Sequence, residues 1–380
     1  MRLGIVAGEA SGDQLAAGLI HALRARVPDL QVQAVAGPRM QEAGCDVLAQ
    51  AEELAVMGLA EVLPEVSRLW KLRRRLRAHW LEHRPDVFVG VDAPDFTLGL
   101  ERALKAEGIP TVHYVSPTVW AWRAGRVHGI ANAADALLCL FPFEPDCYRE
   151  TSLQAHFVGH PFAQAMARQP EPAQARAKLG LPAQGPLLAL VPGSRRGEVA
   201  QLGPLFFQTA RLLQARLPEL HCVLPAANAE RRSELEALRA EHAPELPLTL
   251  LDGQMRLALR AADLAVVTSG TATLETLLAG TPMLVAYRTG AFTNFLMRDL
   301  GLLRTRHVSL PNILAGRGLV PEFLQEQAEP LALSRAAWLL LTHAGAREAQ
   351  QQAFAQLREA IHRDTDALAA DAVLRTCGRA

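Results

Sequence analysis

The sequence predicts an α/β fold built from two Rossmann-like domains, each a parallel sheet covered by helices. The chain has 380 residues, more than a single hydrophobic core usually holds. Short apolar segments alternate with helical segments in both halves, which is the pattern of a parallel sheet with crossover helices. A stretch rich in Ala, Gln and Pro follows residue 161 and separates the halves. We therefore expect domains at 1–165 and 166–345, with helices in 346–380 that brace the first domain.

The expected elements follow one another in the order that this fold requires. In the first half, we expect strands at 3–7, 87–91 and 111–115 and helices at 14–26, 69–83 and 97–107. In the second half, we expect strands at 187–191, 221–225, 248–251 and 264–267 and helices at 204–217, 229–240 and 271–279. Helical segments at 331–341 and 346–363 close the chain. Residues that follow each strand are the first candidates for a binding or catalytic site, because open parallel sheets bind ligands beyond the carboxyl ends of their strands.

Composition excludes several classes of protein. The net charge is zero, so the overall balance gives no reason to expect nucleic acid as a partner. The five cysteines are scattered without zinc-ligand spacing, so we expect reduced thiols and no metal site. The first apolar run ends at Ala7, too short for a signal peptide, and no run approaches the roughly 20 residues that cross a membrane. We expect a cytoplasmic protein that contacts membranes only at their surface.

Four common catalytic motifs are missing from the sequence. The loop after the first strand lacks the GxGxxG spacing of a dinucleotide site. The GxxxxGK[ST] phosphate loop, the GxSxG elbow and the HExxH helix are also absent. These absences argue against dehydrogenases, P-loop nucleoside triphosphatases, elbow-type hydrolases and zinc proteases.

Two loops that follow strands of the second domain have the composition of a diphosphate site. Their residues of interest are Gly193, Ser194, Arg195, Ser269, Gly270, Thr271 and Glu275. The glycines let backbone N–H groups approach an anion, and Arg195 can fork onto phosphate. Thr271 opens a helix whose N-terminal dipole also favours an anion, although the same residue suits a simple helix cap. Two such loops on one sheet favour a ligand.

Two carboxylates follow the strand at 87–91 in the first domain. Asp92 sits at the strand end, where a general base would face a cleft. Asp95 follows Pro94 at the start of a helix and is expected to cap it. We therefore assign the catalytic role to Asp92.

Five further polar residues of the first domain are candidates for acceptor binding or for the wall of a cleft. They are Glu9, Ser11, Asp13, His113 and Ser116. Ser11 and Asp13 suit helix capping equally well. A lone histidine within a strand is also typical of a hydrogen-bonded core residue, so His113 carries little weight.

One segment combines basic and large apolar residues. Its members are Leu69, Trp70, Lys71, Arg73, Arg74, Arg75 and Arg77. Such a helix can lie at a membrane interface. The alternative is a solvated helix whose apolar face packs on the core.

Seven motifs in order resemble the lipid-A-disaccharide synthase family. They are VAGEASGD at 6–13, ELAVMG at 53–58, VGVDAPDF at 89–96, HYVSP at 113–117, PGSR at 192–195, SGTATLE at 269–275 and SLPN at 309–312. The resemblance extends from residue 3 to residue 329 and implies an inverting GT-B glycosyltransferase whose two parallel sheets face a central cleft. It implies transfer from UDP-2,3-diacylglucosamine to 2,3-diacylglucosamine 1-phosphate (lipid X), which gives a β(1→6) disaccharide phosphate and UDP.

The resemblance also implies roles for single residues. Asp92 resembles the family's catalytic base. The UDP-binding elements of the family correspond to Arg195 and the region of Thr271. Its donor-site residues correspond to Glu275 and Asn312. No cofactor or metal is implied. An acylated acceptor favours the membrane interpretation of the basic helix, on the inner membrane of a Gram-negative bacterium. A homodimer is compatible with these expectations.

Other interpretations remain open at this stage. Another UDP-sugar enzyme of the same architecture, such as a UDP-N-acetylglucosamine 2-epimerase or the peptidoglycan lipid-intermediate transferase, would differ in its products. A non-catalytic nucleotide-sugar sensor would bind UDP without turnover.

Overall fold

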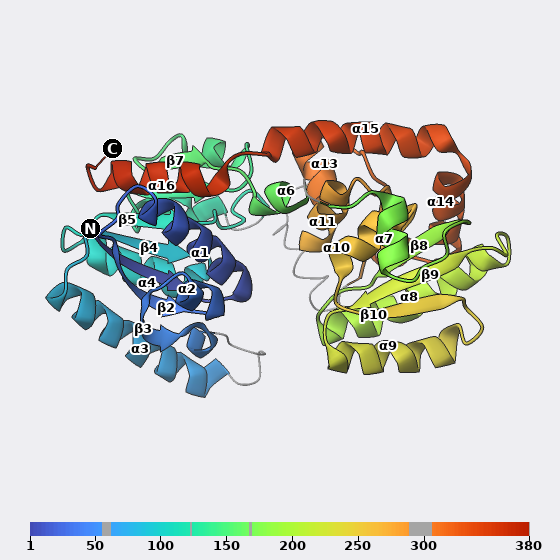
Figure 1. Ribbon diagram of the computed structural model, residues 1–380, viewed down its shortest axis with the longest axis horizontal. Helices are drawn as coiled ribbons and strands as arrows, with labels where there is room; N and C mark the ends of the chain where they lie inside the picture. The colour runs from blue at the N-terminus through green and yellow to red at the C-terminus, as the bar shows by residue number, and fades with distance from the viewer. Residues whose placement is uncertain (55–61, 122–123, 167–168, 289–305, 380) are drawn as a thin grey trace. The chain divides into compact units, whose positions relative to one another are not determined.

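The protein consists of two compact units, seen in a computed structural model that describes residues 1–54, 62–121, 124–166, 169–288 and 306–379 (Figure 1). The first unit is Met1–Pro161 together with Ile361–Ala380, and the second is Phe162–Ala360. The chain therefore passes from one unit to the other twice. The first passage lies at residue 161, beside the expected boundary at 165.

The C-terminal segment is divided between the units. Helix α15 (Ala344–Ile361) belongs to the second unit, where the Gln350 side chain accepts from the Met283 N–H at 2.9 Å and donates to its carbonyl at 3.2 Å. Only α16 (Thr365–Thr376) joins the first unit, where it packs against α1 (Ala10–Arg24). The segment 346–380, which we expected to brace the first domain, thus contributes to both units.

The sheet of the first unit contains seven parallel strands among the described residues, in the order β3-β2-β1-β4-β5-β6-β7. Their bounds are β1 Arg2–Ala7, β2 Gln31–Ala36, β3 Asp46–Gln50, β4 Val87–Val91, β5 Thr111–Tyr114, β6 Ala136–Cys139 and β7 Gln154–Phe157. Every residue of β4 is buried, which explains its unbroken apolar sequence. The direction of strand order reverses between β1 and β4, which is where sheets of this kind bind ligands.

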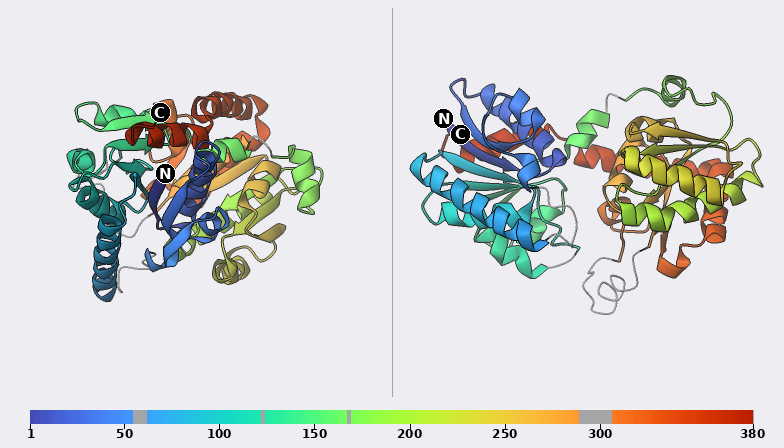
Figure 2. Two further views of the ribbon diagram at one scale, coloured as in Figure 1. Left: turned by 60° about the vertical axis from the view of Figure 1, so that its left-hand side comes forward. Right: turned by 90° about the horizontal axis from the view of Figure 1, so that it is seen from below.

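Helices cover both faces of this sheet. They are α1, α2 (Pro38–Glu42), α3 (Val62–Glu82), α4 (Pro94–Lys105), α5 (Val127–Ala131) and α16. Helices α1 and α16 lie on one face, and α3 and α4 lie together on the other (Figure 2). Trp80 anchors α3 against the sheet, because its fully buried ring packs edge-on against the ring of Phe88 in β4, with 4.8 Å between the ring centroids. Gly4 of β1 leaves the room that the indole needs.

The sheet of the second unit contains six parallel strands in the described part of the chain, in the order β10-β9-β8-β11-β12-β13. Their bounds are β8 Leu187–Val191, β9 His221–Ala226, β10 Leu248–Asp252, β11 Leu264–Thr268, β12 Met283–Tyr287 and β13 Glu322–Leu324. The strand order reverses between β8 and β11, so the two predicted anion-binding loops leave neighbouring strands at the same edge.

Helices also flank the second sheet. They are α6 (Pro161–Met166), α7 (Pro172–Lys178), α8 (Arg196–Gln214), α9 (Ala229–His242), α10 (Met255–Ala261), α11 (Thr271–Ala279), α13 (Leu310–Ala315), α14 (Pro330–Thr342) and α15. Helices α8 and α14 pack together over a core that includes Phe206, Phe207 and Leu333. None of the helices in the described residues is long and apolar enough to span a bilayer.

Candidate active site

Asp92 lies in a tight turn between β4 and α4. Asp92 and Ala93 both adopt left-handed backbone conformations, with φ of 53° and 45°. Hydrogen bonds hold this turn: the Asp92 N–H donates to the Tyr114 carbonyl at 2.8 Å, and the Thr97 hydroxyl donates to the Asp92 carbonyl at 2.9 Å. Two successive non-glycine residues in this region carry strain, which concentrates at functional sites. The turn places Asp92 at the carboxyl edge of the sheet, beside its switch point.

A cavity of about 460 Å³ surrounds this turn. Asp92, Glu9 and Asp95 line it from the sheet edge, and Trp70 and Arg73 line it from α3. Asp92 is half-buried, whereas Glu9 and Asp95 are exposed. The predicted base, the predicted acceptor residue Glu9 and part of the basic helix thus share one cavity within the first unit.

Asp95 does not cap α4. Ala93 occupies the capping position, and Asp95 lies in the first turn of the helix. Its exposed carboxylate instead pairs with the Arg126 guanidinium at 2.9 Å. The left-handed turn at Asp92 and Ala93 explains the difference, since it starts the helix earlier than the sequence pattern predicts.

Asp13 has a structural role that the sequence did not predict. It is only 4% exposed, and its carboxylate accepts from the N–H groups of Gly37, Arg39 and Met40 at 3.0, 2.9 and 3.1 Å. It therefore caps α2, not its own helix, and its oxygens are committed to backbone donors. Ser11 is exposed in the first turn of α1.

His113 and Ser116 belong to the core of the first unit and do not line the cavity. His113 Nδ1 lies 2.8 Å from Glu101 Oε1 of α4, and both side chains are fully buried. Burial raises the pKa of Glu101, while His113 opposes that shift. Gly90 provides the space for this carboxylate, because any side chain there would collide with it. The Ser116 hydroxyl is buried against the Tyr148 hydroxyl at 3.0 Å.

The loop after β8 binds a carboxylate of its own chain. Gly193 has φ of 122°, and any Cβ there would collide with Glu198. The Glu198 carboxylate accepts from the N–H groups of Ser194 and Arg195 at 3.1 and 3.2 Å. The Arg195 side chain is 85% exposed, and its guanidinium lies 3.5 Å from Glu198. The loop is thus able to hold an anion, and Glu198 is the residue that our sequence reasoning missed. Its place three residues after Arg195, in the first turn of α8, is a signal of capping that could have revealed it.

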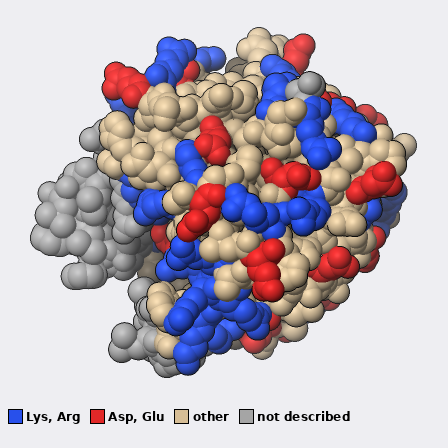
Figure 3. All heavy atoms as spheres, turned by 90° about the vertical axis from the view of Figure 1, so that its left-hand side faces the viewer, with Lys and Arg blue, Asp and Glu red and all other residues tan. Residues whose placement is uncertain are grey.

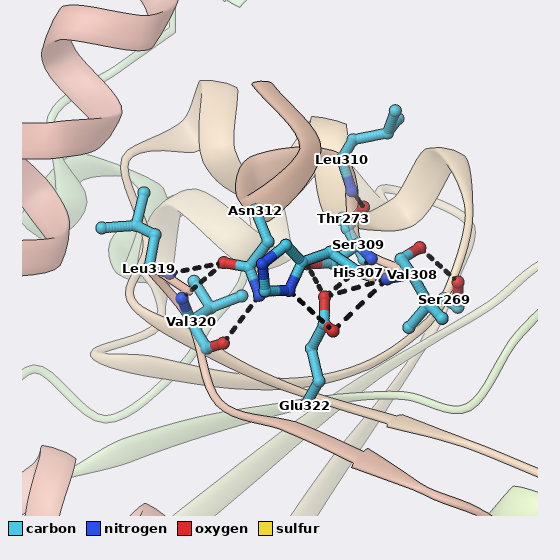
Figure 4. A network of polar contacts seen from close by, with 10 residues as sticks. All are labelled: Ser269, Thr273, His307, Val308, Ser309, Leu310, Asn312, Leu319, Val320 and Glu322. Atoms are coloured by element: carbon cyan, nitrogen blue, oxygen red, sulfur yellow. Dashed lines mark hydrogen bonds and ion pairs between the residues drawn. The ribbon is translucent and has the colours of Figure 1, made fainter. Parts of the chain in front are cut away.

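A network of polar contacts organises the second predicted loop (Figure 4). Glu322 of β13 accepts from the N–H groups of Val308 and Ser309 and from the Ser309 hydroxyl, at 3.2, 2.8 and 2.5 Å. The Ser269 hydroxyl donates to the Val308 carbonyl at 2.9 Å, which ties the end of β11 to the same segment. Gly270 and Thr271 stay exposed at the start of α11, available to a ligand. The role of Glu322 was not predicted from the sequence, because its partners Val308 and Ser309 lie more than ten residues away and no local motif connects them to it.

Glu275 and Asn312 are engaged within the protein. Asn312 is 1% exposed, and its amide accepts from the N–H groups of Leu319 and Val320 and donates to the Val320 carbonyl. These bonds use the amide oxygen and one of the two amide N–H groups, so the side chain holds the turn after α13. Glu275 pairs with Arg256 at 3.1 Å.

The basic segment on α3 has two faces. Leu72, Leu76 and Trp80 are buried against the sheet, whereas Trp70 is 53% exposed with the Arg74 guanidinium 5.8 Å from its ring centre. Lys71, Arg74, Arg75 and Arg77 are exposed, and Leu69 and Arg73 are half-buried. Lys and Arg side chains gather low on the face drawn in Figure 3, on the side of the first unit that carries α3. The helix therefore combines a core-facing apolar stripe with a basic outer surface.

Comparison with known proteins decides the family. The model of the family described as lipid-A-disaccharide synthetase matches residues 3–373. The lipid-A-disaccharide synthase of Salmonella paratyphi A is 48% identical over 374 residues, which cover 98% of this chain and 97% of that protein. This chain belongs to the lipid-A-disaccharide synthase family. The resemblance inferred from seven motifs is confirmed, and with it the assignment as a glycosyltransferase of lipid A biosynthesis. Motif residues 55–58 lie outside the described residues.

Solved structures show that the fold extends beyond this family. A putative UDP-N-acetylglucosamine 2-epimerase from Listeria monocytogenes has a TM-score of 0.65 at 14% identity, covering 98% of this chain and 94% of that one. The UDP-N-acetylglucosamine 2-epimerase of Neisseria meningitidis, bound to UDP-GlcNAc, has a TM-score of 0.65 at 13% identity and full coverage of both chains, 100% each. A trehalose-6-phosphate synthase has a TM-score of 0.57 at 13% identity, covering 100% of this chain and 99% of that one. The prediction of a GT-B fold with two parallel-sheet units is confirmed.

Proposed function

We propose that this enzyme joins UDP-2,3-diacylglucosamine to 2,3-diacylglucosamine 1-phosphate with Asp92 as the general base. The products are the β(1→6)-linked disaccharide 1-phosphate and UDP. The observation that carries the residue assignment is the strained turn that holds Asp92 at the switch point, half-buried in the wall of a cavity large enough for a sugar. Family membership supports the reaction itself.

Asp92 would act on the acceptor's 6-hydroxyl. As the hydroxyl oxygen attacks the anomeric carbon of the donor, its proton passes to the Asp92 carboxylate. The bond between that carbon and the UDP oxygen breaks with its electron pair staying on UDP. A single displacement inverts the anomeric configuration, so the reaction requires no nucleophile from the protein.

The second unit supplies groups suited to the leaving diphosphate. Arg195 and the N-terminus of α11 follow the neighbouring strands β8 and β11, so both lie at one sheet edge. Backbone N–H donors, a helix dipole and a guanidinium stabilise the negative charge that develops as UDP leaves. In this proposal the diphosphate takes over the two N–H donors that Glu198 occupies in the structure.

The acylated substrates require contact with a membrane. The exposed Trp70, Lys71 and Arg75 of α3 have the chemistry of an interfacial helix, with an aromatic ring among basic side chains. We assign this surface to peripheral association with the cytoplasmic face of the inner membrane. Trp70 also lines the Asp92 cavity, which supports a proposal in which the acceptor binds next to the lipid contact.

One experiment tests the reaction. The purified enzyme is incubated with both acylated sugars in detergent, and the products are identified by mass and by release of UDP. We expect the disaccharide 1-phosphate in equal amount to UDP. An epimeric product formed from UDP-N-acetylglucosamine alone, or UDP binding without any disaccharide, would contradict the proposal.

A further inference from the structure

Five arginines line a groove between α3 and α4. A cavity of about 680 Å³ is bordered by Arg73, Arg74 and Arg77 of α3 and by Arg102 of α4. A second cavity of about 390 Å³ is bordered by Arg73, Arg102 and Arg126. Arg73 also lines the Asp92 cavity. The arginine-lined space, which we call the arginine groove, therefore shares a wall with the proposed site of proton transfer.

The positive charge of the arginine groove is only partly balanced. Arg77 pairs with Glu107 at 3.3 Å, and Arg126 pairs with Asp95 at 2.9 Å. Arg102 donates to a neutral group, the backbone carbonyl of Gly129, at 3.1 Å. Within the described ranges, Arg73, Arg74 and Arg102 have no carboxylate partner. Three guanidinium groups around one groove favour a ligand with more than one negative charge.

Gly99 shows that α4 leaves space for Arg73. A Cβ built at this position would lie 2.5 Å from Arg73 Nη1, so the guanidinium rests directly against the backbone of α4. Glycine inside a helix is unfavourable compared with alanine, so its presence is consistent with a need for this close approach. Arg73 is half-buried, in contrast to the exposed Arg75 on the same helix. The geometry thus points Arg73 into the groove and away from the outer surface.

We infer that the arginine groove binds the phosphate monoester of the acceptor. This inference rests on the proposed function, in which the acceptor carries its 6-hydroxymethyl group and its 1-phosphate on the two ring carbons that flank the ring oxygen. The adjoining cavities differ in charge: Glu9 and Asp92 line the Asp92 cavity, and Arg74, Arg77, Arg102 and Arg126 line the arginine groove, while Arg73 and Asp95 border both. A phosphate is repelled by the carboxylates and bound by the guanidinium groups, which directs the hydroxyl toward Asp92. The groove would orient the acceptor as well as bind it.

Comparison of two acceptors tests the inference. One is 2,3-diacylglucosamine 1-phosphate and the other is the same molecule without its phosphate, both dispersed in detergent so that no membrane is present. The wild-type enzyme should have the higher kcat/KM for the phosphorylated acceptor. The quantity to compare is the ratio of kcat/KM for the phosphorylated acceptor to kcat/KM for the unphosphorylated one. Arg73→Gln and Arg102→Gln should each reduce this ratio about tenfold or more, as expected for loss of a charge-assisted contact. Gly99→Ala should reduce it too, since it keeps every charge but displaces Arg73.

Arg84→Gln is the matched control, because it removes one positive charge from an exposed side chain just after α3, outside the arginine groove and outside the surface assigned to the membrane. It should keep the wild-type ratio between the two acceptors. Thermal melting of each variant establishes that it is folded, and the conservative Arg73→Lys should recover part of the ratio. If the wild-type enzyme makes no disaccharide from either acceptor, the result contradicts the proposed function itself. The groove assignment alone is contradicted only by results from an enzyme that makes the disaccharide.

Two results would overturn the inference in an active enzyme. In the first, Arg73→Gln and Arg102→Gln lower kcat/KM equally for both acceptors or leave both unchanged. In the second, these variants lose binding to phosphatidylglycerol vesicles while the acceptor ratio stays at its wild-type value. That second result would assign the groove to lipid headgroups.

Discussion

Replacing Glu144 with Gln should make the stability of the first unit less dependent on pH. Glu144 is 3% exposed in the loop after β6, and its carboxylate accepts from the N–H groups of Leu140 and Phe141 at 2.9 and 3.0 Å. Burial raises its pKa from the ordinary 4.5 to about 7, and the donated hydrogen bonds only partly oppose this. The folded protein therefore prefers the protonated side chain.

The direction and size of the effect follow from this shift. Because the folded pKa lies above the unfolded one, the stabilising contribution of the proton is complete below pH 4.5 and is lost as pH rises through about 7. A shift from 4.5 to about 7 corresponds to a loss of about 3 kcal/mol by pH 8. Glutamine keeps an oxygen that can accept the same N–H bonds, but it carries no charge at any pH.

Urea denaturation at pH 5 and pH 8 measures this difference. The wild-type protein should lose about 2.5 kcal/mol more than Glu144→Gln between the two values, because part of the effect is already lost at pH 5. Glu150→Gln, which removes an exposed carboxylate nearby, is the control for the loss of one acidic residue. Equal pH dependence in the wild type and in Glu144→Gln would refute the reasoning.

Three further predictions concern two buried polar side chains and the basic surface of α3. Asp13→Ala should destabilise the first unit by about 2–4 kcal/mol in urea, because three donors of α2 lose their acceptor; a loss below 1 kcal/mol would contradict its capping role. Asn312→Ala should lower the melting temperature of the second unit, and UDP affinity measured by calorimetry should change less than for Arg195→Gln. Replacing Lys71 and Arg75 with Glu should weaken cosedimentation with anionic vesicles, by roughly 1 kcal/mol per charge removed; unchanged binding would argue for a purely solvated helix.

The sheets could be predicted from sequence because buried parallel strands have unbroken apolar sequences. β4 and β8 are buried at every position, and both were predicted with their observed bounds. β2 and β3 were not predicted, because Gln and Asp interrupt their apolar pattern. β6 and β12 were not predicted either, although their sequences are apolar, because a short apolar run does not distinguish a buried strand from a buried helix. β13 has three residues, too few for a periodic signal.

The candidate site was predictable where it depends on strand ends and unpredictable where it depends on distant partners. Asp92 directly follows β4, and Arg195 lies in the loop after β8, so their positions at a sheet edge could be expected. Asp13 looked like a ligand or a cap for its own helix, but its donors lie on α2, which no local pattern connects to it. His113 was difficult for the same reason, because its partner Glu101 comes from α4.

The turnover of Asp92→Asn tests the central claim most directly. Asparagine keeps the size of the side chain but cannot take the proton of the acceptor's 6-hydroxyl, so kcat should fall by roughly 10²–10⁴-fold. UDP affinity should stay at the wild-type value. Asp95→Asn, at the neighbouring exposed carboxylate, should keep turnover within a few-fold of wild type. If Asp92→Asn turns over at a rate near that of the wild type, or if Asp95→Asn proves the more damaging, Asp92 is not the general base.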